Sequence, residues 1–159
     1  MKLESATPAP PPDARNLRVA IVTARFNERI VARLLESAQR NWISMGGAES
    51  ALVVHNVPGA FELPFACRRL SRQGGFDAIV ALGCIIRGDT PHFEYVAGEC
   101  ARGLMQVGLD TDVPVIFGVL TVDSVAQAEE RADPARLDKG REFIEGAVAM
   151  AQFGKRGAR

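Results

Sequence analysis

The chain has few of the residues that build a disulfide framework or a metal site. Its three cysteines, Cys67, Cys84 and Cys100, are widely spaced and form no C-x-x-C pair, which argues against structural disulfides and against zinc held by thiolates. Its two histidines, His55 and His92, stand at no metal-ligand spacing from each other or from a cluster of carboxylates. We therefore expect no metal site.

An excess of one charge and long hydrophobic runs are also missing. Nineteen basic residues against nineteen acidic ones give a formal net charge of zero, which offers no electrostatic basis for binding nucleic acid. No apolar stretch approaches the ~20 residues that span a bilayer, and the first residues lack the hydrophobic core of a signal peptide. We expect a cytoplasmic protein without a nucleic-acid or membrane partner. Neither a Walker motif nor G-x-G-x-x-G is present, so a nucleotide-binding function has no motif support.

What is present indicates one globular domain behind a short leader. The 159 residues, 47% of them hydrophobic and 24% charged, suffice for a single core. Residues 1–16 are rich in proline and alanine and can form neither a helix nor a central strand. We expect a mobile leader over residues 1–16 and a single domain over 17–159.

Apolar strands and amphipathic helices alternate along the domain. Continuous apolar runs are typical of parallel strands that are covered on both faces, and the alternation predicts a doubly wound α/β fold. We expect a three-layer sandwich in which helices flank a flavodoxin-like four-stranded parallel sheet of order 2-1-3-4. The expected strands are 18–24, 50–55, 77–83 and 113–120; helices follow each of them, the last two over about 124–131 and 138–153.

The connection after the third strand carries the strongest functional signal. Ligands of such sheets bind beyond the carboxyl ends of the strands, and Arg87–His92 lies there, with His92 at the start of the next helix. Unpaired N–H groups at a helix start bind anions, and a histidine moves protons near neutral pH. An anion cradle beside a proton carrier suggests chemistry on a phosphorylated or carboxylated small molecule.

Several of these residues have a structural explanation as well as a functional one. Thr90 can cap the helix, with Pro91 at its first position, or take part in binding the anion. Arg87 can bind the anion or pair with a nearby acid. Arg131 ends a short helix, where an arginine is usually solvated. Cys84 could be a nucleophile served by His92, but a small apolar residue on a buried strand is the favoured interpretation.

Two further strand ends leave similar alternatives open. Phe26 follows the first strand, and its ring can either face a planar heterocycle or close the core. Glu62 lies just inside a helix start after the second strand. Its carboxylate can interact with the helix dipole or accept hydrogen bonds from ligand hydroxyls.

Five segments together resemble the lumazine synthases, the 6,7-dimethyl-8-ribityllumazine synthase family of riboflavin biosynthesis. They occur in the order and spacing of that family and cover about residues 17–153. The segments are Ala24–Asn27, Val57–Pro64, Leu82–Phe93, Pro114–Thr121 and Lys139–Gly140.

The resemblance implies a transferase that condenses 5-amino-6-(ribitylamino)uracil with 3,4-dihydroxy-2-butanone 4-phosphate, releasing phosphate and water, without a cofactor. It also implies that Phe26 stacks on the pyrimidine, whose edges contact the backbone of Cys84, Ile85 and Ile86. The segment Ala60, Phe61 and Glu62 then holds the ribityl chain. Asp89, Thr90 and Arg131 hold the phosphate, and His92 carries protons.

The resemblance further implies a homo-oligomer whose sites lie between subunits, with Phe117, Arg131 and Lys139 supplied by a neighbour. A pentamer is the minimum unit, and pentamers of the family can join into a closed shell of about sixty chains. The prolines of the leader and the connection 132–138, where relatives often carry glycine, favour a free pentamer. Two alternatives to the enzyme are a flavin- or lumazine-binding paralogue, the runner-up, and a shell protein whose site has decayed.

Overall fold

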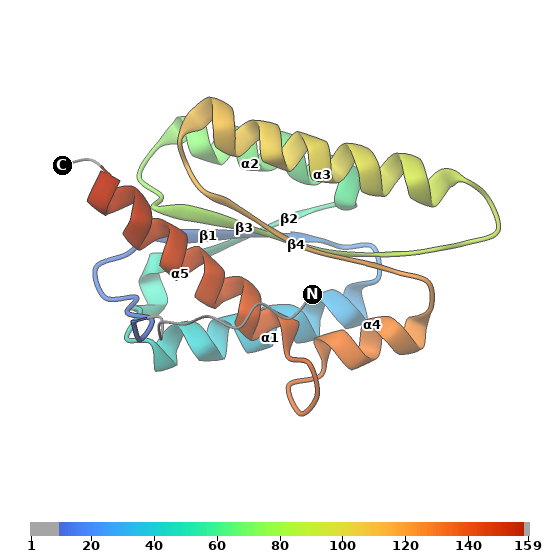
Figure 1. Ribbon diagram of the computed structural model, residues 1–159, viewed down its shortest axis with the longest axis horizontal. Helices are drawn as coiled ribbons and strands as arrows, with labels where there is room; N and C mark the ends of the chain where they lie inside the picture. Colours follow the sequence, from blue (N-terminus) through green and yellow to red (C-terminus); the bar gives the residue numbers. More distant parts are fainter. Residues whose placement is uncertain (1–9, 158–159) are drawn as a thin grey trace.

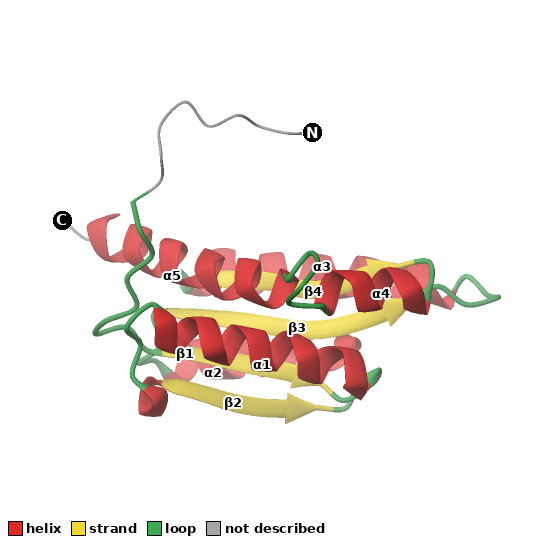
Figure 2. Cartoon of the chain, turned by 90° about the horizontal axis from the view of Figure 1, so that it is seen from below, coloured by secondary structure: helices red, strands yellow, loops and turns green. Residues whose placement is uncertain are grey.

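The computed structural model describes residues 10–157 and contains one parallel sheet. Its strands are β1 (Val19–Ala24), β2 (Leu52–Val57), β3 (Ala78–Ile86) and β4 (Val115–Val122). They lie in the order β2-β1-β3-β4, so the predicted flavodoxin-like order is confirmed. All carboxyl ends point to one side, the right of Figure 2.

Helices cover both faces of the sheet and complete the three predicted layers. On one face lie α1 (Glu28–Ser44), α4 (Val125–Ala132) and α5 (Lys139–Gly157), and on the other lie α2 (Leu63–Gln73) and α3 (His92–Thr111) (Figure 1). Two short 3₁₀ helices, Glu49–Ala51 and Ala60–Glu62, flank β2. Across residues 10–157, no helix is both long and apolar enough to cross a membrane.

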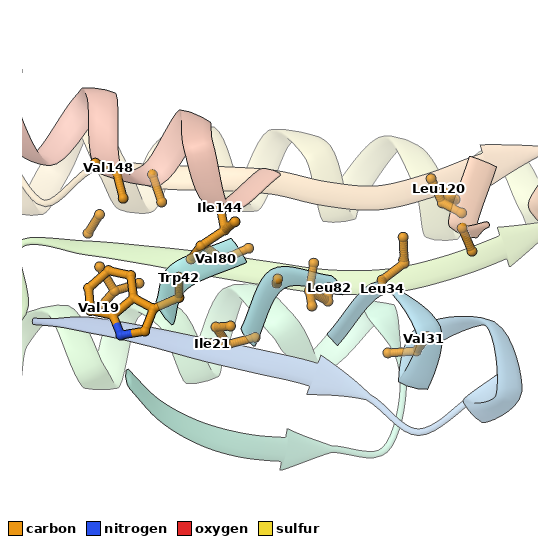
Figure 3. Packing of buried hydrophobic residues seen from close by; sticks show 14 of the residues in the cluster. Val19, Ile21, Val31, Leu34, Trp42, Val80, Leu82, Leu120, Ile144 and Val148 are labelled. Atoms are coloured by element: carbon orange, nitrogen blue, oxygen red, sulfur yellow. The ribbon is translucent and has the colours of Figure 1, made fainter. Parts of the chain in front are cut away.

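The core follows from the apolar strands. Every residue of β1 and the first seven of β3 are buried, as expected for central strands with helices on both sides. Trp42 of α1 and Ile144 and Val148 of α5 pack between these two helices and the sheet (Figure 3). The close approach of α5 to α1 requires Gly140, because a Cβ there would lie 2.4 Å from the carbonyl oxygen of Leu34.

Most strand ends differ from the sequence prediction by one to three residues, and two of these differences have a clear structural cause. The predicted third strand ends at residue 83, whereas β3 continues to Ile86 because it pairs with β4 as far as Ile86–Val122. The predicted second strand begins at residue 50, where the chain instead forms the 3₁₀ turn Glu49–Ala51 before β2. The extension of β3 matters for the site, since it carries the strand into the region predicted to bind the ligand.

Part of the expected leader contacts the domain. Ala14 is fully buried and its N–H donates to the Met45 carbonyl oxygen at 2.9 Å, while Gln152 of α5 donates to the carbonyl oxygen of Asp13. Contact with the domain thus begins before residue 17. The expectation for residues 1–9 lies outside the described residues.

The connection between α4 and α5 turns without glycine. Asp138 adopts a positive φ of 44°, the left-handed conformation that glycine takes most easily. Its N–H donates to the Asp133 carbonyl oxygen at 3.0 Å, and its carboxylate accepts a hydrogen bond from Ser37 of α1. Side-chain and backbone contacts therefore fix the start of α5.

Candidate functional site

The carboxyl ends of β1, β2 and β3 surround a cavity of about 590 Å³. Most of the residues proposed for the site from the sequence line it together: Phe26, Ala60, Phe61, Glu62, Cys84, Ile85, Ile86, Thr90 and His92. Sequence reasoning had not selected six further lining residues: Asn27, Gly59, Gly88, Phe93, Tyr95 and Val96. A second hollow of about 470 Å³ is lined by α2 alone and contains no strand end.

The loop after β1 presents Phe26 to the cavity rather than to the core. Phe26 is 73% exposed, which excludes the alternative that its ring closes the core. Its N–H donates to the Pro58 carbonyl oxygen at 3.2 Å, and the Arg25 N–H donates to that of Val57 at 2.9 Å. The loops after β1 and β2 are therefore joined by two backbone hydrogen bonds.

Asn27 fixes the same loop to β3. Its backbone is left-handed, with φ 59° and ψ 43°, and its carbonyl oxygen accepts the first hydrogen bonds of α1 from Ile30 and Val31. Its side-chain Nδ2 donates to the Cys84 carbonyl oxygen at 2.7 Å. The chemistry of a side-chain amide at a helix start was visible in the sequence, but its partner 57 residues away was not.

The end of β3 offers backbone groups to a ligand. On one side β3 pairs with β4 up to Ile86, but on the other its pairing with β1 ends at Leu82. One edge of the strand over Cys84–Ile86 thus faces the cavity instead of another strand, with the Cys84 carbonyl oxygen already bonded to Asn27. Such an edge can bind the alternating carbonyl and N–H groups of a heterocycle.

The thiol of Cys84 is unsuited to nucleophilic catalysis. The residue is buried, and burial raises the pKa of its thiol to about 11. The protonated form then predominates at neutral pH, and the protonated thiol is not a nucleophile. The interpretation of Cys84 as a buried strand residue is the one that the geometry favours.

Glu62 ends the 3₁₀ turn after β2 and stands at the N-cap of α2, yet its side chain makes no capping hydrogen bond. A Cβ on Gly59 would lie 3.1 Å from the Glu62 carboxylate, so the side chain folds back over the turn. Since Glu62 lines the cavity and is exposed, its carboxylate can accept hydrogen bonds from a ligand.

The β3–α3 connection extends beyond the sheet at the far right of Figure 1. Helix α3 begins at His92, as expected. Pro91 stands at its N-cap and no side chain caps it, so the alternative in which Thr90 caps a helix that starts at Pro91 is not observed. Thr90 Oγ1 accepts only a long bond, 3.4 Å, from the His92 N–H. The amides of 88–90 have no acceptor among the described residues and are free to bind an anion.

Arg87 pairs with nearby acids, which agrees with the structural alternative for this residue. Its Nε lies 2.9 Å from Asp123 Oδ1, and its guanidinium also bonds to Glu94 in the first turn of α3. Hydrogen bonds to these two carboxylates raise the pKa of Arg87.

Four residues proposed for the site do not line the cavity. Asp89 is exposed on the loop, and Phe117 is 40% exposed on the edge strand β4. Arg131 bonds to the Gln127 carbonyl oxygen at 3.1 Å within its own helix, and Lys139 pairs with Glu142. The cavity of one chain therefore combines an exposed aromatic ring with amides that have no acceptor among the described residues, whereas Arg131 and Lys139 make their contacts elsewhere.

Comparison with known proteins agrees with the segments singled out above. The family described as 6,7-dimethyl-8-ribityllumazine synthase matches residues 16–155. Relatives from two strains of Thermus thermophilus are both called 6,7-dimethyl-8-ribityllumazine synthase. Each is 46% identical over 140 residues, which cover 88% of this chain and 89% of the relative.

Proposed function

The chain belongs to the 6,7-dimethyl-8-ribityllumazine synthase family, and from this premise we propose how its residues share the reaction. The activity is that of a transferase in riboflavin biosynthesis, which condenses 5-amino-6-(ribitylamino)uracil with 3,4-dihydroxy-2-butanone 4-phosphate and releases phosphate and water. The names of the relatives do not favour a non-catalytic flavin-binding paralogue. The cavity beyond the strand ends is our candidate for the place of this reaction.

The pyrimidine of the first substrate binds between Phe26 and the end of β3. A flat ring stacks on the exposed face of Phe26, and its polar edge bonds to the free backbone edge at Cys84–Ile86. The ribityl chain extends over Ala60–Glu62, where Glu62 accepts bonds from its hydroxyls. The open edge of β3 supports this placement, because it offers donors and acceptors at strand spacing.

The phosphate of the second substrate binds the loop 88–90, whose amides point to no other acceptor in the described chain. His92 starts the helix directly behind that loop and lines the cavity. It accepts and returns protons as the amine attacks the carbonyl, water leaves and the phosphate group is eliminated. Each of these steps needs proton transfer next to a bound anion, which is the arrangement the loop provides.

A neighbouring subunit completes the site with Phe117, Arg131 and Lys139. These residues lie outside the cavity of their own chain, and Arg131 supplies the forked positive charge that a phosphate needs in addition to amides. Several large, exposed apolar side chains on α2, α3 and the 3₁₀ turn before α2, which lie on one side of the sheet, support contact between subunits. They are Phe61, Phe65, Tyr95, Met105 and Leu109.

The oligomer is a ring in which each chain gives residues to one neighbour and receives them from the other, which requires cyclic symmetry. We propose a pentamer that does not assemble further, because the turn before α5 is held by Asp133, Asp138 and Ser37 rather than left flexible by glycine. The cytoplasmic location stays a prediction.

The observation that carries this proposal is the cavity that joins Phe26, the free edge of β3 and the amide loop before His92. The direct test is to mix the purified protein with the two substrates and follow the lumazine absorbance together with the released phosphate. Equimolar appearance of both products is expected. Binding of the uracil substrate without phosphate release would favour the paralogue instead.

A further inference from the structure

Arg87 contacts three elements at the phosphate end of the cavity. Its backbone N–H donates to the Val122 carbonyl oxygen at 2.9 Å, and its guanidinium bonds to Asp123 just after β4. The same guanidinium bonds to Glu94 in the first turn of α3 and lies 4.4 Å from the centre of the Phe93 ring. Arg87 thus links both ends of the loop 88–91 to the end of β4.

The charges around Arg87 make it a poor phosphate ligand by itself. One guanidinium faces two carboxylates, Glu94 and Asp123, so the group carries a net negative charge. A phosphate brought to Arg87 would meet both carboxylates at the same place. Arg87 is therefore better suited to holding the loop than to binding the anion.

Loss of the Arg87 contacts should displace the neighbouring loop without lowering the stability of the whole domain. About half of the Arg87 side chain and most of both partners are exposed, so the ion pairs add little to global stability. The loop between them, however, has no hydrogen bonds from its amides 88–90 to other described groups. Its position relative to His92 then depends on the residue that holds its two ends.

We propose that Arg87 is a positioning residue for the phosphorylated substrate. Its bonds to Glu94 and Asp123, together with its contact to Phe93, keep the amides of 88–90 and the imidazole of His92 at the spacing that the substrate requires. This inference rests on the proposed role of the loop as the phosphate cradle. Arg87 itself does not touch the substrate.

The test compares R87M with the wild type in steady-state kinetics for each substrate separately. A misplaced binding loop typically costs about ten- to a hundredfold, so we expect KM for the butanone phosphate to rise by about that factor. We expect KM for the uracil substrate to change less than about twofold, because Phe26 and β3 are untouched. R87K should recover part of the loss, and the midpoint of thermal unfolding should be unchanged.

The partner variants E94Q and D123N distinguish positioning from direct binding. If Arg87 holds the loop, each variant weakens the phosphate substrate, although each removes a negative charge from its surroundings. If Arg87 binds the phosphate directly, each variant frees the guanidinium and tightens binding. Tighter or unchanged KM for the phosphate substrate in both variants would overturn the proposal.

R15M serves as the matched control, because Arg15 is also an exposed arginine bonded to a carboxylate, that of Asp13, and lies at the other end of the sheet. It should leave both KM values unchanged. A calorimetric titration with inorganic phosphate gives a readout without turnover, in which R87M should bind phosphate more weakly than the wild type. If the wild type is inactive, the proposed function is refuted. If the wild type is active and R87M has the same KM and the same phosphate affinity, only the role of Arg87 is refuted.

Discussion

Replacing Phe26 by alanine separates ligand binding from folding more cleanly than any other single change in the cavity. Its ring is 73% exposed and borders the cavity, while its backbone N–H is bonded to the Pro58 carbonyl oxygen, a contact that alanine keeps. The substitution should therefore leave the loop in place and remove only the stacking face.

The expected loss of affinity follows from the exposed ring. A stacked aromatic pair contributes about 0.5–1.5 kcal/mol beyond the area it buries, and covering one ring face buries roughly 40 Å², worth about 1 kcal/mol. The sum, about 1.5–2.5 kcal/mol, corresponds to binding weaker by about ten- to seventyfold. Since only about a quarter of Phe26 is covered in the chain, folding should lose less than about 0.8 kcal/mol.

The assay is a calorimetric or fluorescence titration with the uracil substrate, beside a thermal unfolding curve for each variant. F26W should keep most of the affinity because it retains a flat face, whereas F26L should keep the apolar contact and lose the stacking. The interpretation of Phe26 is refuted if F26A binds the ring as tightly as the wild type. It is also refuted if F26A and F26W lose the same affinity and both unfold several degrees earlier.

Four further predictions concern the proton carrier, the loop after β1, the buried thiol and the assembly. H92A should slow turnover by about 10- to 10³-fold without unfolding the protein, because a positioned acid–base group is lost; an unchanged kcat would remove His92 from the reaction. N27G keeps the left-handed backbone and loses the 2.7 Å bond to Cys84, so the ring substrate should bind about fivefold more weakly. N27A should in addition lose about 1 kcal/mol of stability to backbone strain, and equal unfolding midpoints for the two variants would contradict this. Because burial raises the pKa of Cys84 to about 11, iodoacetamide at neutral pH should not reduce turnover; alkylation of Cys84 that abolishes activity would restore it as a candidate nucleophile. Light scattering should give a mass of about five chains, and a mass near sixty chains would refute the free pentamer.

Much of the fold could be predicted because the strands are nearly continuous apolar runs and the helices between them are amphipathic. Parallel pairing and right-handed crossovers then leave few possible strand orders, and the flavodoxin-like order is the one observed. Boundaries were less predictable where tertiary contacts decide them. Cys84–Ile86 belong to β3 because β4 pairs with them. The residues near this strand end do not by themselves indicate that pairing.

The site was predictable where a residue type and its place at a strand end coincide, as for Phe26, Glu62 and His92. Contacts between distant segments were not visible in the sequence. The bond from Asn27 to Cys84 and the pairing of Arg87 with Asp123 each join residues far apart in the chain. Whether the ring of Phe26 faced the core or the solvent also depended on the tertiary fold, because both orientations are compatible with its position.

The proposal that neighbouring subunits share each site is tested most directly by mixing two impaired variants in one oligomer. H92A and R131A are co-expressed with different affinity tags, and oligomers that carry both tags are purified and assayed. If His92 and Arg131 of one site come from different chains, about a quarter of the sites in an equal, random mixture are intact. H92A co-expressed with F26A is the control, because both of those residues belong to the same chain's half of the site and no intact site can form. For the first mixture we predict turnover of about a quarter of the wild-type value above the mean of the two variants assayed alone. For the second mixture we predict only that mean; the mean value in both mixtures would contradict the shared site.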